Sequence, residues 1–322
     1  MKKPVVLVTR KLPKVTENRM QNLFNVRLNT SDRVMSFEEI IKRSEGASVV
    51  VPTVTDEINA GLVSALPSTV EIIANFGAGV NHIDLAATTQ RNICVTNTPD
   101  VLTEDTADLT IALMLAAARR LPEGCQIVKE KLWGGWAPTF LLGTSLTNKK
   151  LGIIGLGKIG YAVAVRARCF GMQIYYHNRK PVSEFIMAKL DATYWPSLNK
   201  MLAEVDFLSI NCPQTTETHH LLDAERLGKL QKHAIVINSA RGGIIDEAEL
   251  AERLEKGEIA AAGLDVFENE PEINEKLFNL KNVVLAPHLG SATNESRVAM
   301  GARVIENIIS FVSGQVPKDK IY

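Results

Sequence analysis

Polar side chains follow three successive predicted strands in the second half of the chain. Arg241 stands in "NSARGG", Asp265 and Glu270 stand in "GLDVFENEP", and His288 stands in "APHLGSAT". Ligands of parallel α/β sheets bind beyond the carboxyl ends of the strands, so these side chains should meet at one site. There an arginine can anchor an anionic substrate, an acid can tune a histidine, and the histidine can donate a proton. Each residue alone is more often structural or solvated, but together they predict a catalytic cluster.

A glycine-rich segment precedes this cluster in the chain. The residues "LGIIGLGKIG" at 151–160 place Gly155, Gly157 and Gly160 at the G-x-G-x-x-G spacing, after an apolar strand and before a helix-period segment. In that context the first glycine permits a tight turn and the second lets N–H groups approach a pyrophosphate. The third lets the helix pack closely on the strand. The pattern predicts a dinucleotide-binding loop; the alternative is a glycine-rich turn without a ligand.

The next predicted strand ends in a basic turn, "MQIYYHNRK" at 172–180. Asn178 lies 18 residues after Gly160, where NAD-binding loops usually carry an acid that accepts the ribose hydroxyls. Asparagine removes the charge that would repel a 2′-phosphate, Arg179 can fork onto phosphate oxygens, and Lys180 adds a point charge. The turn therefore favours NADP, with NAD as the weaker alternative. A solvated basic turn that merely lacks the acid is the other interpretation.

Short β-branched runs alternate with helix-period segments along the chain, which is typical of α/β proteins with parallel sheets. A long helix is predicted at 102–121, ended by Pro122 and Gly124, and a last helix at 293–313. We expect the last helix to return to a first, discontinuous domain. Six strands in the second half predict one doubly wound dinucleotide-binding sheet. The predicted strands are 4–9, 47–52, 70–75 and 93–97 in the first half, then 150–155, 172–177, 205–211, 233–239, 260–267 and 282–287.

Length and composition limit the classes of partner. A chain of 322 residues has room for two domains, since single cores stop growing near about 250–300 residues. The 36 basic and 36 acidic residues cancel, so no overall field attracts nucleic acid or an anionic membrane. The longest apolar stretch, 109–118, is about half a membrane span, and Arg10 interrupts the N-terminal apolar run. The four cysteines form no C-x-x-C pair, which fits a reducing compartment. We expect a cytoplasmic protein without nucleic-acid or membrane partners.

Over nearly its whole length the sequence resembles the D-2-hydroxyacid dehydrogenase family. The segments "GLGKIG", "INSARGGIIDE", "AAAGLDVFENEP" and "APHLGSAT" are similar to its signatures. The segments "NFGAGVNHID", "TPDVLTEDTADLTIALMLAAARRLPEG" and "LWGGWAP" are most similar to its glyoxylate and hydroxypyruvate reductase branch. The resemblance implies two Rossmann-like domains with parallel sheets and usual assembly as a homodimer. Residues 1–99 with 289–322 would form a flavodoxin-like substrate domain, and 100–288 the dinucleotide-binding domain inserted into it.

The resemblance also implies residue roles. Arg241, Glu270 and His288 match the catalytic set without substitution. A small 2-oxo or 2-hydroxy acid would contact the backbone around Ala78 and Gly79. The full set implied for the substrate is Val54, Ala78, Gly79, Trp136, Arg241 and His288. The full set implied for the coenzyme is Thr106, Gly155, Gly157, Lys158, Ile159, Gly160, Asn178, Arg179, Lys180, Cys212, Pro213, Thr218, Ala240, Arg241, Asp265, His288 and Gly290.

The expected reaction is hydride transfer from NADPH to the carbonyl carbon of a small 2-oxo acid. Protonated His288 donates to the developing alkoxide, a role that typically contributes about 10²–10⁴-fold. Glu270 holds the imidazole and favours its protonated form, and Arg241 binds the substrate's carboxylate and carbonyl oxygens. The reaction requires no metal. The remaining histidines show no ligand spacing in the sequence; they are His82, His177, His219, His220 and His233.

Substrate size is indicated by the segment "VVVPTVTDEI" at 49–58, which resembles the loop where phosphoglycerate dehydrogenases carry arginines. Pro52 and Val54 stand there instead, and a buried phosphate without cations is costly, which favours glyoxylate and hydroxypyruvate. In the reductase branch a tryptophan of the partner subunit enters the active site, and Trp136 matches it. Ordinary interface packing of Trp133 and Trp136 is the alternative.

Two other functions stay open from the sequence. One is an NAD-linked dehydrogenase of another small acid, of the D-lactate, glycerate or phosphoglycerate type, and coenzyme preference discriminates it. The other is a dinucleotide-sensing, corepressor-like binding protein, because one such group shares this fold and polar triad. Such proteins carry long tails, whereas the last predicted helix is followed here by only a short segment to Tyr322.

Overall fold

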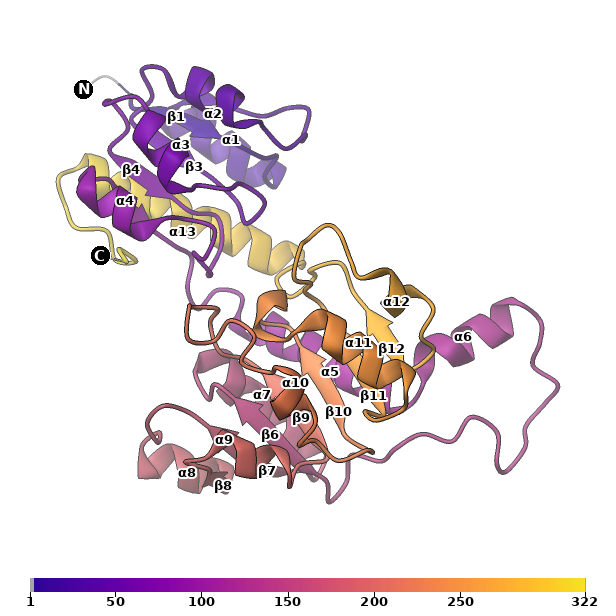
Figure 1. The fold of residues 1–322 in the computed structure, drawn as a ribbon. Helices are drawn as coiled ribbons and strands as arrows, with labels where there is room; N and C mark the ends of the chain where they lie inside the picture. The colour runs from indigo at the N-terminus through magenta and orange to yellow at the C-terminus, as the bar shows by residue number, and fades with distance from the viewer. Residues whose placement is uncertain (1–2, 322) are drawn as a thin grey trace. The chain divides into compact units, whose positions relative to one another are not determined.

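The computed structural model describes residues 3–321, and the chain folds into two compact units. The first unit is Met1–Leu102 with Ser291–Tyr322, and the second is Thr103–Gly290. Each contains one parallel β-sheet covered by helices (Figure 1). The predicted α/β class, with one Rossmann-like unit inserted into another that is discontinuous in sequence, is therefore confirmed.

The first unit has a five-stranded parallel sheet in the order β2-β1-β3-β4-β5, which is the flavodoxin-like 2-1-3-4-5 order. Helix α13 packs against α1 and β4, and so returns the C-terminal part of the chain to this unit (Figure 1). The strands are β1 (Val5–Val8), β2 (Asn25–Arg27), β3 (Val49–Val51), β4 (Ile72–Ala74) and β5 (Cys94–Thr96). The helices are α1 (Lys14–Leu23), α2 (Phe37–Ser44), α3 (Ala60–Ala65), α4 (Leu85–Gln90) and α13 (Asn294–Val312).

The second unit has a seven-stranded parallel sheet in the order β12-β11-β10-β9-β6-β7-β8. Counted from β6, this is the dinucleotide-binding order 3-2-1-4-5-6 with one more strand after the sixth. The strands are β6 (Lys150–Ile154), β7 (Gln173–His177), β8 (Ala192–Tyr194), β9 (Phe207–Ile210), β10 (Ile235–Asn238), β11 (Ala261–Leu264) and β12 (Val283–Leu285). The helices are α5 (Thr103–Ala118), α6 (Leu121–Lys129), α7 (Lys158–Cys169), α8 (Glu184–Leu190), α9 (Leu198–Leu202), α10 (Ala224–Leu227), α11 (Glu247–Glu255) and α12 (Glu275–Phe278), with a 3₁₀ turn η1 (Gly242–Ile244).

Both faces of this second sheet are buried, which explains its continuous apolar strands. Along β10, Ile235 and Ile237 join the core formed with α5 and α7. Val236 points the other way and joins the core formed with α9, α10 and α11. A close-packed sheet deforms little, so the loops beyond its strand ends start from fixed positions.

The sequence-based expectations were wrong for three local features. Strands β2 and β8 were not predicted, and the second sheet has seven strands rather than six. Both β2 and β8 are three-residue edge strands with partly exposed side chains, so neither carries a buried β-branched run. The helix expected at 102–121 ends at Ala118, and Pro122 and Gly124 lie inside the next helix, α6. Pro122 is tolerated in the first turn because no intrahelical N–H bond is needed there.

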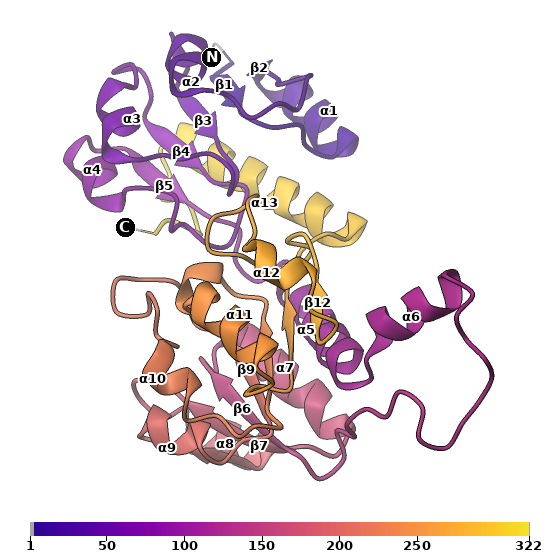
Figure 2. The same ribbon diagram turned by 45° about the vertical axis from the view of Figure 1, so that its right-hand side comes forward.

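Residues 121–142 form an arm that extends away from the sheet and helices of the second unit and returns to them (Figure 2). The return is fixed where the Thr144 N–H donates to the Ala118 carbonyl at 2.8 Å. No residue of α6 is buried, and Trp136 is 84% exposed. The arm's large exposed apolar side chains are Leu121, Val128, Leu132, Trp133, Trp136, Phe140 and Leu142. Within residues 3–321 no helix combines the length and apolar character that crossing a membrane requires.

Candidate active site

A histidine–glutamate pair stands beyond the carboxyl ends of β11 and β12. Nδ1 of His288 lies 2.7 Å from Oε2 of Glu270, and the two side chains are 28% and 31% exposed. The other carboxylate oxygen of Glu270 accepts the Phe267 N–H at 3.0 Å. Burial acts to raise the pKa of Glu270, but the hydrogen bond and charge of His288, the Phe267 N–H and the charge of Arg241 together hold the pKa below its usual value. The Glu270 carboxylate contacts Nδ1 of His288, so Nε2 takes no part in this pair.

Arg241 lies in the loop between β10 and η1, next to this pair. Asn238 shapes the loop, since its Nδ2 donates to the Arg241 carbonyl at 2.9 Å and its Oδ1 accepts the Ala240 N–H at 3.1 Å. A Cβ on Gly242 would lie 1.9 Å from the Phe267 carbonyl carbon, so only glycine lets this loop abut the segment that leads to Glu270. Burial lowers the pKa of Arg241, and the charge of Glu270 opposes that shift.

Asp265 ties the end of β11 to the loop that carries His288. Its two carboxylate oxygens accept the N–H groups of Leu289 at 2.6 Å and Gly290 at 2.8 Å. Burial raises the pKa of Asp265, and these two N–H groups oppose the shift. His288 has a φ of 55°, in the left-handed region that non-glycine residues seldom occupy. Thr106 anchors the same loop by donating to the Gly290 carbonyl at 2.9 Å. A conformation fixed by this many bonds is typical of functional loops.

Glu247 holds the segment that carries Glu270, and sequence reasoning missed this residue. This first residue of α11 is 8% exposed. Its Oε2 accepts the Glu268 N–H and its Oε1 accepts the Asn274 N–H, both at 3.0 Å. One carboxylate thus holds both ends of the segment containing Glu270. In the sequence Glu247 reads as an ordinary acid in a helix's first turn, so no local signal could have revealed this role.

The glycine-rich loop between β6 and α7 has the form that a dinucleotide requires. Gly155 has a φ of +93°, and a Cβ there would lie 2.6 Å from the Cys212 backbone nitrogen. A Cβ on Gly160 would lie 2.3 Å from the Gly155 carbonyl oxygen. Gly157 differs, because a Cβ there would meet no protein atom within 4 Å. Close contact with the backbone requires glycine at positions 155 and 160. At Gly157 no protein atom would obstruct a side chain, so the space at the amino end of α7, beside Lys158 and Ile159, is open. The loop therefore fits a pyrophosphate.

The basic turn after β7 has one fixed residue and two exposed ones. Oδ1 of Asn178 accepts the Leu156 N–H at 2.7 Å, which ties the turn to the glycine-rich loop. Arg179 and Lys180 are exposed. The exposed Glu217 has a lowered pKa through its hydrogen bonds with Thr215 and its own backbone, and through the charge of Arg179. Asn178 thus has a structural partner that the sequence did not predict.

The segment after β9 lies against the same loop. Cys212 is partly buried, and burial raises the pKa of its thiol to about 11. Thr218 closes the turn by donating to the Pro213 carbonyl at 2.7 Å. All four cysteines of the chain are free thiols.

In the first unit, the loop at 77–80 has its carbonyl groups tied inward. Asn75 Nδ2 donates to the Gly77 and Gly79 carbonyls at 3.0 and 2.9 Å, and Asn97 Nδ2 donates to the Ala78 carbonyl at 2.7 Å. A trans peptide points its N–H away from its C=O. The N–H groups of Ala78, Gly79 and Val80 therefore point to the opposite side of the loop, where they can bind an anion.

Val54 lies in a tight turn of the first unit and is 37% exposed. Asp56 closes the turn by accepting the Thr53 N–H at 2.7 Å. Arg10 approaches this turn, a cation that sequence reasoning missed, and donates to Thr55 Oγ1 at 2.7 Å. Its guanidinium is also paired with Asp32 at 3.0 Å, so its charge is already compensated.

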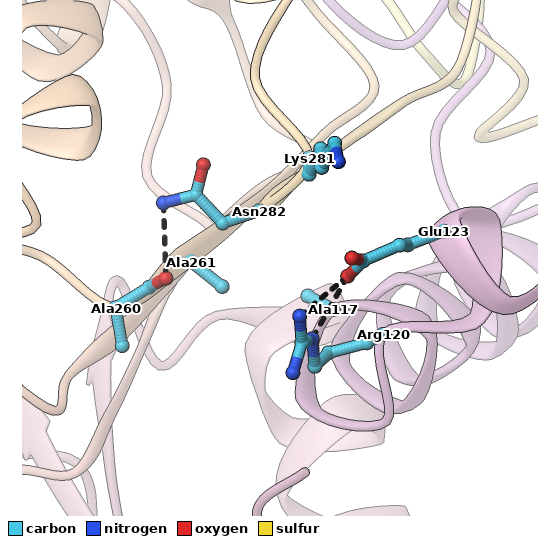
Figure 3. A pocket seen from close by; sticks show the side chains of 7 residues that line it. All are labelled: Ala117, Arg120, Glu123, Ala260, Ala261, Lys281 and Asn282. Carbon is cyan, nitrogen blue, oxygen red and sulfur yellow. Dashed lines mark hydrogen bonds and ion pairs between the residues drawn. The ribbon is translucent and has the colours of Figure 1, made fainter. Parts of the chain in front are cut away.

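A hollow of about 300 Å³ lies at the opposite, amino edge of the second sheet, where α6 leaves α5 (Figure 3). Arg120 pairs with Glu123 at 2.8 Å, and Asn282 Nδ2 donates to the Ala260 carbonyl at 3.1 Å. Arg120, Glu123 and Asn282 are thus engaged with one another or with the main chain. The hollow is lined by Ala117, Arg120, Glu123, Ala260, Ala261, Lys281 and Asn282.

Comparison with known proteins bears on the chemistry of these strand ends. Residues 111–290 match the family model described as D-isomer specific 2-hydroxyacid dehydrogenase, NAD binding domain. A glyoxylate reductase of Thermococcus litoralis is 40% identical over 99% of this chain and 97% of its own. The structure of an NADPH-dependent glyoxylate/hydroxypyruvate reductase from Sinorhizobium meliloti, in complex with NADP and malonate, is 35% identical with a TM-score of 0.89, over 99% of this chain and 97% of that one. A 2-hydroxyacid dehydrogenase structure from Polaromonas, described as NAD-binding, is 38% identical with a TM-score of 0.93 over both whole chains.

Proposed function

Because the chain belongs to the D-isomer specific 2-hydroxyacid dehydrogenase family, we propose that it is an NADPH-dependent reductase of small 2-oxo acids. Glyoxylate would be reduced to glycolate and hydroxypyruvate to D-glycerate. The observation that carries the proposal is the contact of His288 Nδ1 with Glu270 Oε2 at 2.7 Å beside Arg241, which prepares a proton donor next to an anion anchor. Relatives named glyoxylate reductase support the substrate class.

The chain's own residues would act on the substrate in three ways. Arg241 binds the carboxylate and carbonyl oxygens and so sets the orientation of the carbonyl. His288 holds a proton at Nε2 and donates it to the carbonyl oxygen as negative charge develops there, while Glu270 balances the imidazolium charge. We assign the N–H groups of Ala78 and Gly79 to the substrate carboxylate as well. NADPH, when bound, supplies the hydride.

The preference for NADPH is supported by the basic turn. Asn178 places no charge against a 2′-phosphate, and Arg179 and Lys180 are exposed and able to bind one. The residues that would hold the rest of the dinucleotide are those at Gly157 and the start of α7. An NAD-linked enzyme is the second candidate, because Glu217 lies within the electrostatic reach of Arg179 and reduces its attraction for phosphate.

Small, unphosphorylated substrates are supported by the Val54 turn, where the charge of Arg10 is already compensated by Asp32.

A homodimer is supported by the arm at 121–142, whose apolar side chains are exposed in the single chain. Apolar patches of this kind mark protein–protein contacts. We propose that the arm packs on a second copy and that Trp136 contacts the partner's substrate.

The free cysteines support a reducing, cytoplasmic location.

The test is a panel of 2-oxo acids assayed with NADPH and with NADH. We expect the highest kcat/KM for glyoxylate or hydroxypyruvate with NADPH, and little turnover of a phosphorylated 3-carbon acid. Equal kcat/KM with both coenzymes would remove the NADPH preference and leave the reductase. Sedimentation of the purified enzyme would show a dimer, and an Asp substitution at Leu132 would shift it toward the monomer.

A further inference from the structure

Two adjacent histidines and a glutamate form a cluster separate from the His288–Glu270 pair. His219, His220 and Glu268 each offer one ligand atom, and these atoms all lie within 4.8 Å of one another. The rings of His219 and His220 are stacked, with centroids 4.2 Å apart and planes inclined by 24°. His220 Nε2 lies 2.6 Å from Glu268 Oε1. Sequence spacing could not reveal the cluster, because the glutamate follows His220 only after 48 residues.

The backbone holds both imidazoles on one side of the chain. Consecutive side chains of an extended segment point to opposite sides. His220 instead has a φ of 46°, in the left-handed region that costs a non-glycine residue free energy. Neighbouring carbonyls fix this conformation, since the His219 N–H donates to Thr215 at 2.9 Å and the His220 N–H donates to Gly243 at 2.8 Å. The stacked rings are therefore a built feature and do not arise from two free surface side chains.

The carboxylate of the cluster is also held in place. The Glu268 N–H donates to the buried carboxylate of Glu247 at 3.0 Å. The side chains of His220 and Glu268 are 35% and 27% exposed, and His219 is exposed. The cluster is thus fixed by its backbone and still open to an ion from solution.

We propose that His219, His220 and Glu268 bind a divalent transition-metal ion of the Zn²⁺ type. Imidazole nitrogen and carboxylate oxygen are ligands that Zn²⁺ uses, at about 2.0–2.2 Å. Two imidazoles favour Zn²⁺, Co²⁺ or Ni²⁺ over Mg²⁺ and Ca²⁺, which take oxygen ligands. Three protein ligands leave a fourth position for water. Because Glu268 lies two residues before Glu270, a bound ion also holds the segment that carries the partner of His288. The ion is not needed for the reduction.

The test is calorimetric titration of Zn²⁺ into the tag-free chain, with the exposed Cys125 and Cys169 replaced by Ser because cysteine thiolates in general are zinc ligands. We expect one ion per chain. His219→Ala and Glu268→Gln should each weaken binding by about 10-fold or more, at least the loss seen for partners outside the ligand shell. His233→Ala is the matched control, since His233 pairs with Asp206 beside Lys149 and has no place in the cluster.

Two further measurements make the outcome decisive. Co²⁺ should give the visible absorption of a site with nitrogen and oxygen ligands, and His219→Ala should abolish it. Mg²⁺ titration should give no binding heat. The proposal is overturned when Zn²⁺ binds the parent chain, His219→Ala and Glu268→Gln with equal affinity, or when the parent chain binds no Zn²⁺. His219 is exposed, so its replacement leaves the fold intact and a negative result is informative.

Discussion

The carboxyl edge of the second sheet has two ends that are built differently. At β10–β12 the side chains themselves are fixed, as in the contact of His288 with Glu270 and the two N–H bonds to Asp265. At β6–β7 the backbone is fixed, by Gly155 and by the bond from Leu156 to Asn178, but Arg179 and Lys180 are exposed. Proton transfer needs a precise geometry, whereas binding a phosphate needs mainly charge.

This difference indicates which properties can change independently. Substitutions in the His288–Glu270 pair at the fixed end should lower turnover and leave coenzyme affinity nearly unchanged. Substitutions at the exposed end should change the choice of coenzyme and leave turnover unchanged. Variants at each end can test that separation.

The largest effect is expected for His288→Ala. The proton is needed only as charge develops on the substrate oxygen, so kcat should fall by about 10²–10⁴-fold. The dissociation constant of NADPH, measured by fluorescence titration, should be nearly unchanged. His233→Ala should keep wild-type turnover. Unchanged kcat in the His288 variant would exclude the proton-donor role.

Arg179→Ala should act on the coenzyme alone. A charge-assisted hydrogen bond contributes about 1.5–3 kcal/mol, so NADPH affinity should fall by about 10- to 150-fold. NADH offers a hydroxyl at that position, and its affinity should change little. Dissociation constants for both coenzymes are compared at one salt concentration, because exposed charges are screened.

Lys200→Ala, at another exposed cation of the second unit, is the matched control. It should alter neither affinity. Equal losses of NADPH and NADH in the Arg179 variant would mean that this arginine supports the turn and does not bind the phosphate.

Glu247→Gln tests whether the buried carboxylate of Glu247 holds the segment that carries Glu270. Glutamine keeps one acceptor but turns an NH₂ group toward a backbone N–H, so the bond to Glu268 or to Asn274 is lost. We expect a loss of about 1.5–3 kcal/mol in the free energy of unfolding, measured with urea, together with a lower kcat. Glu252→Gln on the same helix, in an exposed pair with Lys256, should cost under about 0.5 kcal/mol. Equal losses in the two variants would exclude the special role of Glu247.

Much of the fold could be predicted because the inner strands are apolar runs between helix-period segments. The edge strands β2 and β8 could not, since partly exposed three-residue strands lack that pattern. Arg241, Glu270 and His288 could be singled out because each stands within six residues of the carboxyl end of an apolar strand. Glu247 and the bond between Asn178 and Leu156 could not, because both depend on contacts between segments that only the folded chain brings together.

The smallest effect is expected for Asn178→Asp, which separates charge from structure at the exposed end. A carboxylate oxygen can still accept the Leu156 N–H, so the glycine-rich loop should keep its shape and the variant should unfold at the wild-type urea concentration. Exposed charge interactions contribute about 0.2–1 kcal/mol, so repulsion of the 2′-phosphate should weaken NADPH by no more than about 5-fold. NADH should bind more tightly, because the carboxylate accepts its ribose hydroxyls. The ratio of the two dissociation constants measures the change. A destabilised variant that loses both coenzymes would show that the Asn178 amide is required for the loop, and the two ends of the sheet would then differ less than their exposure indicates.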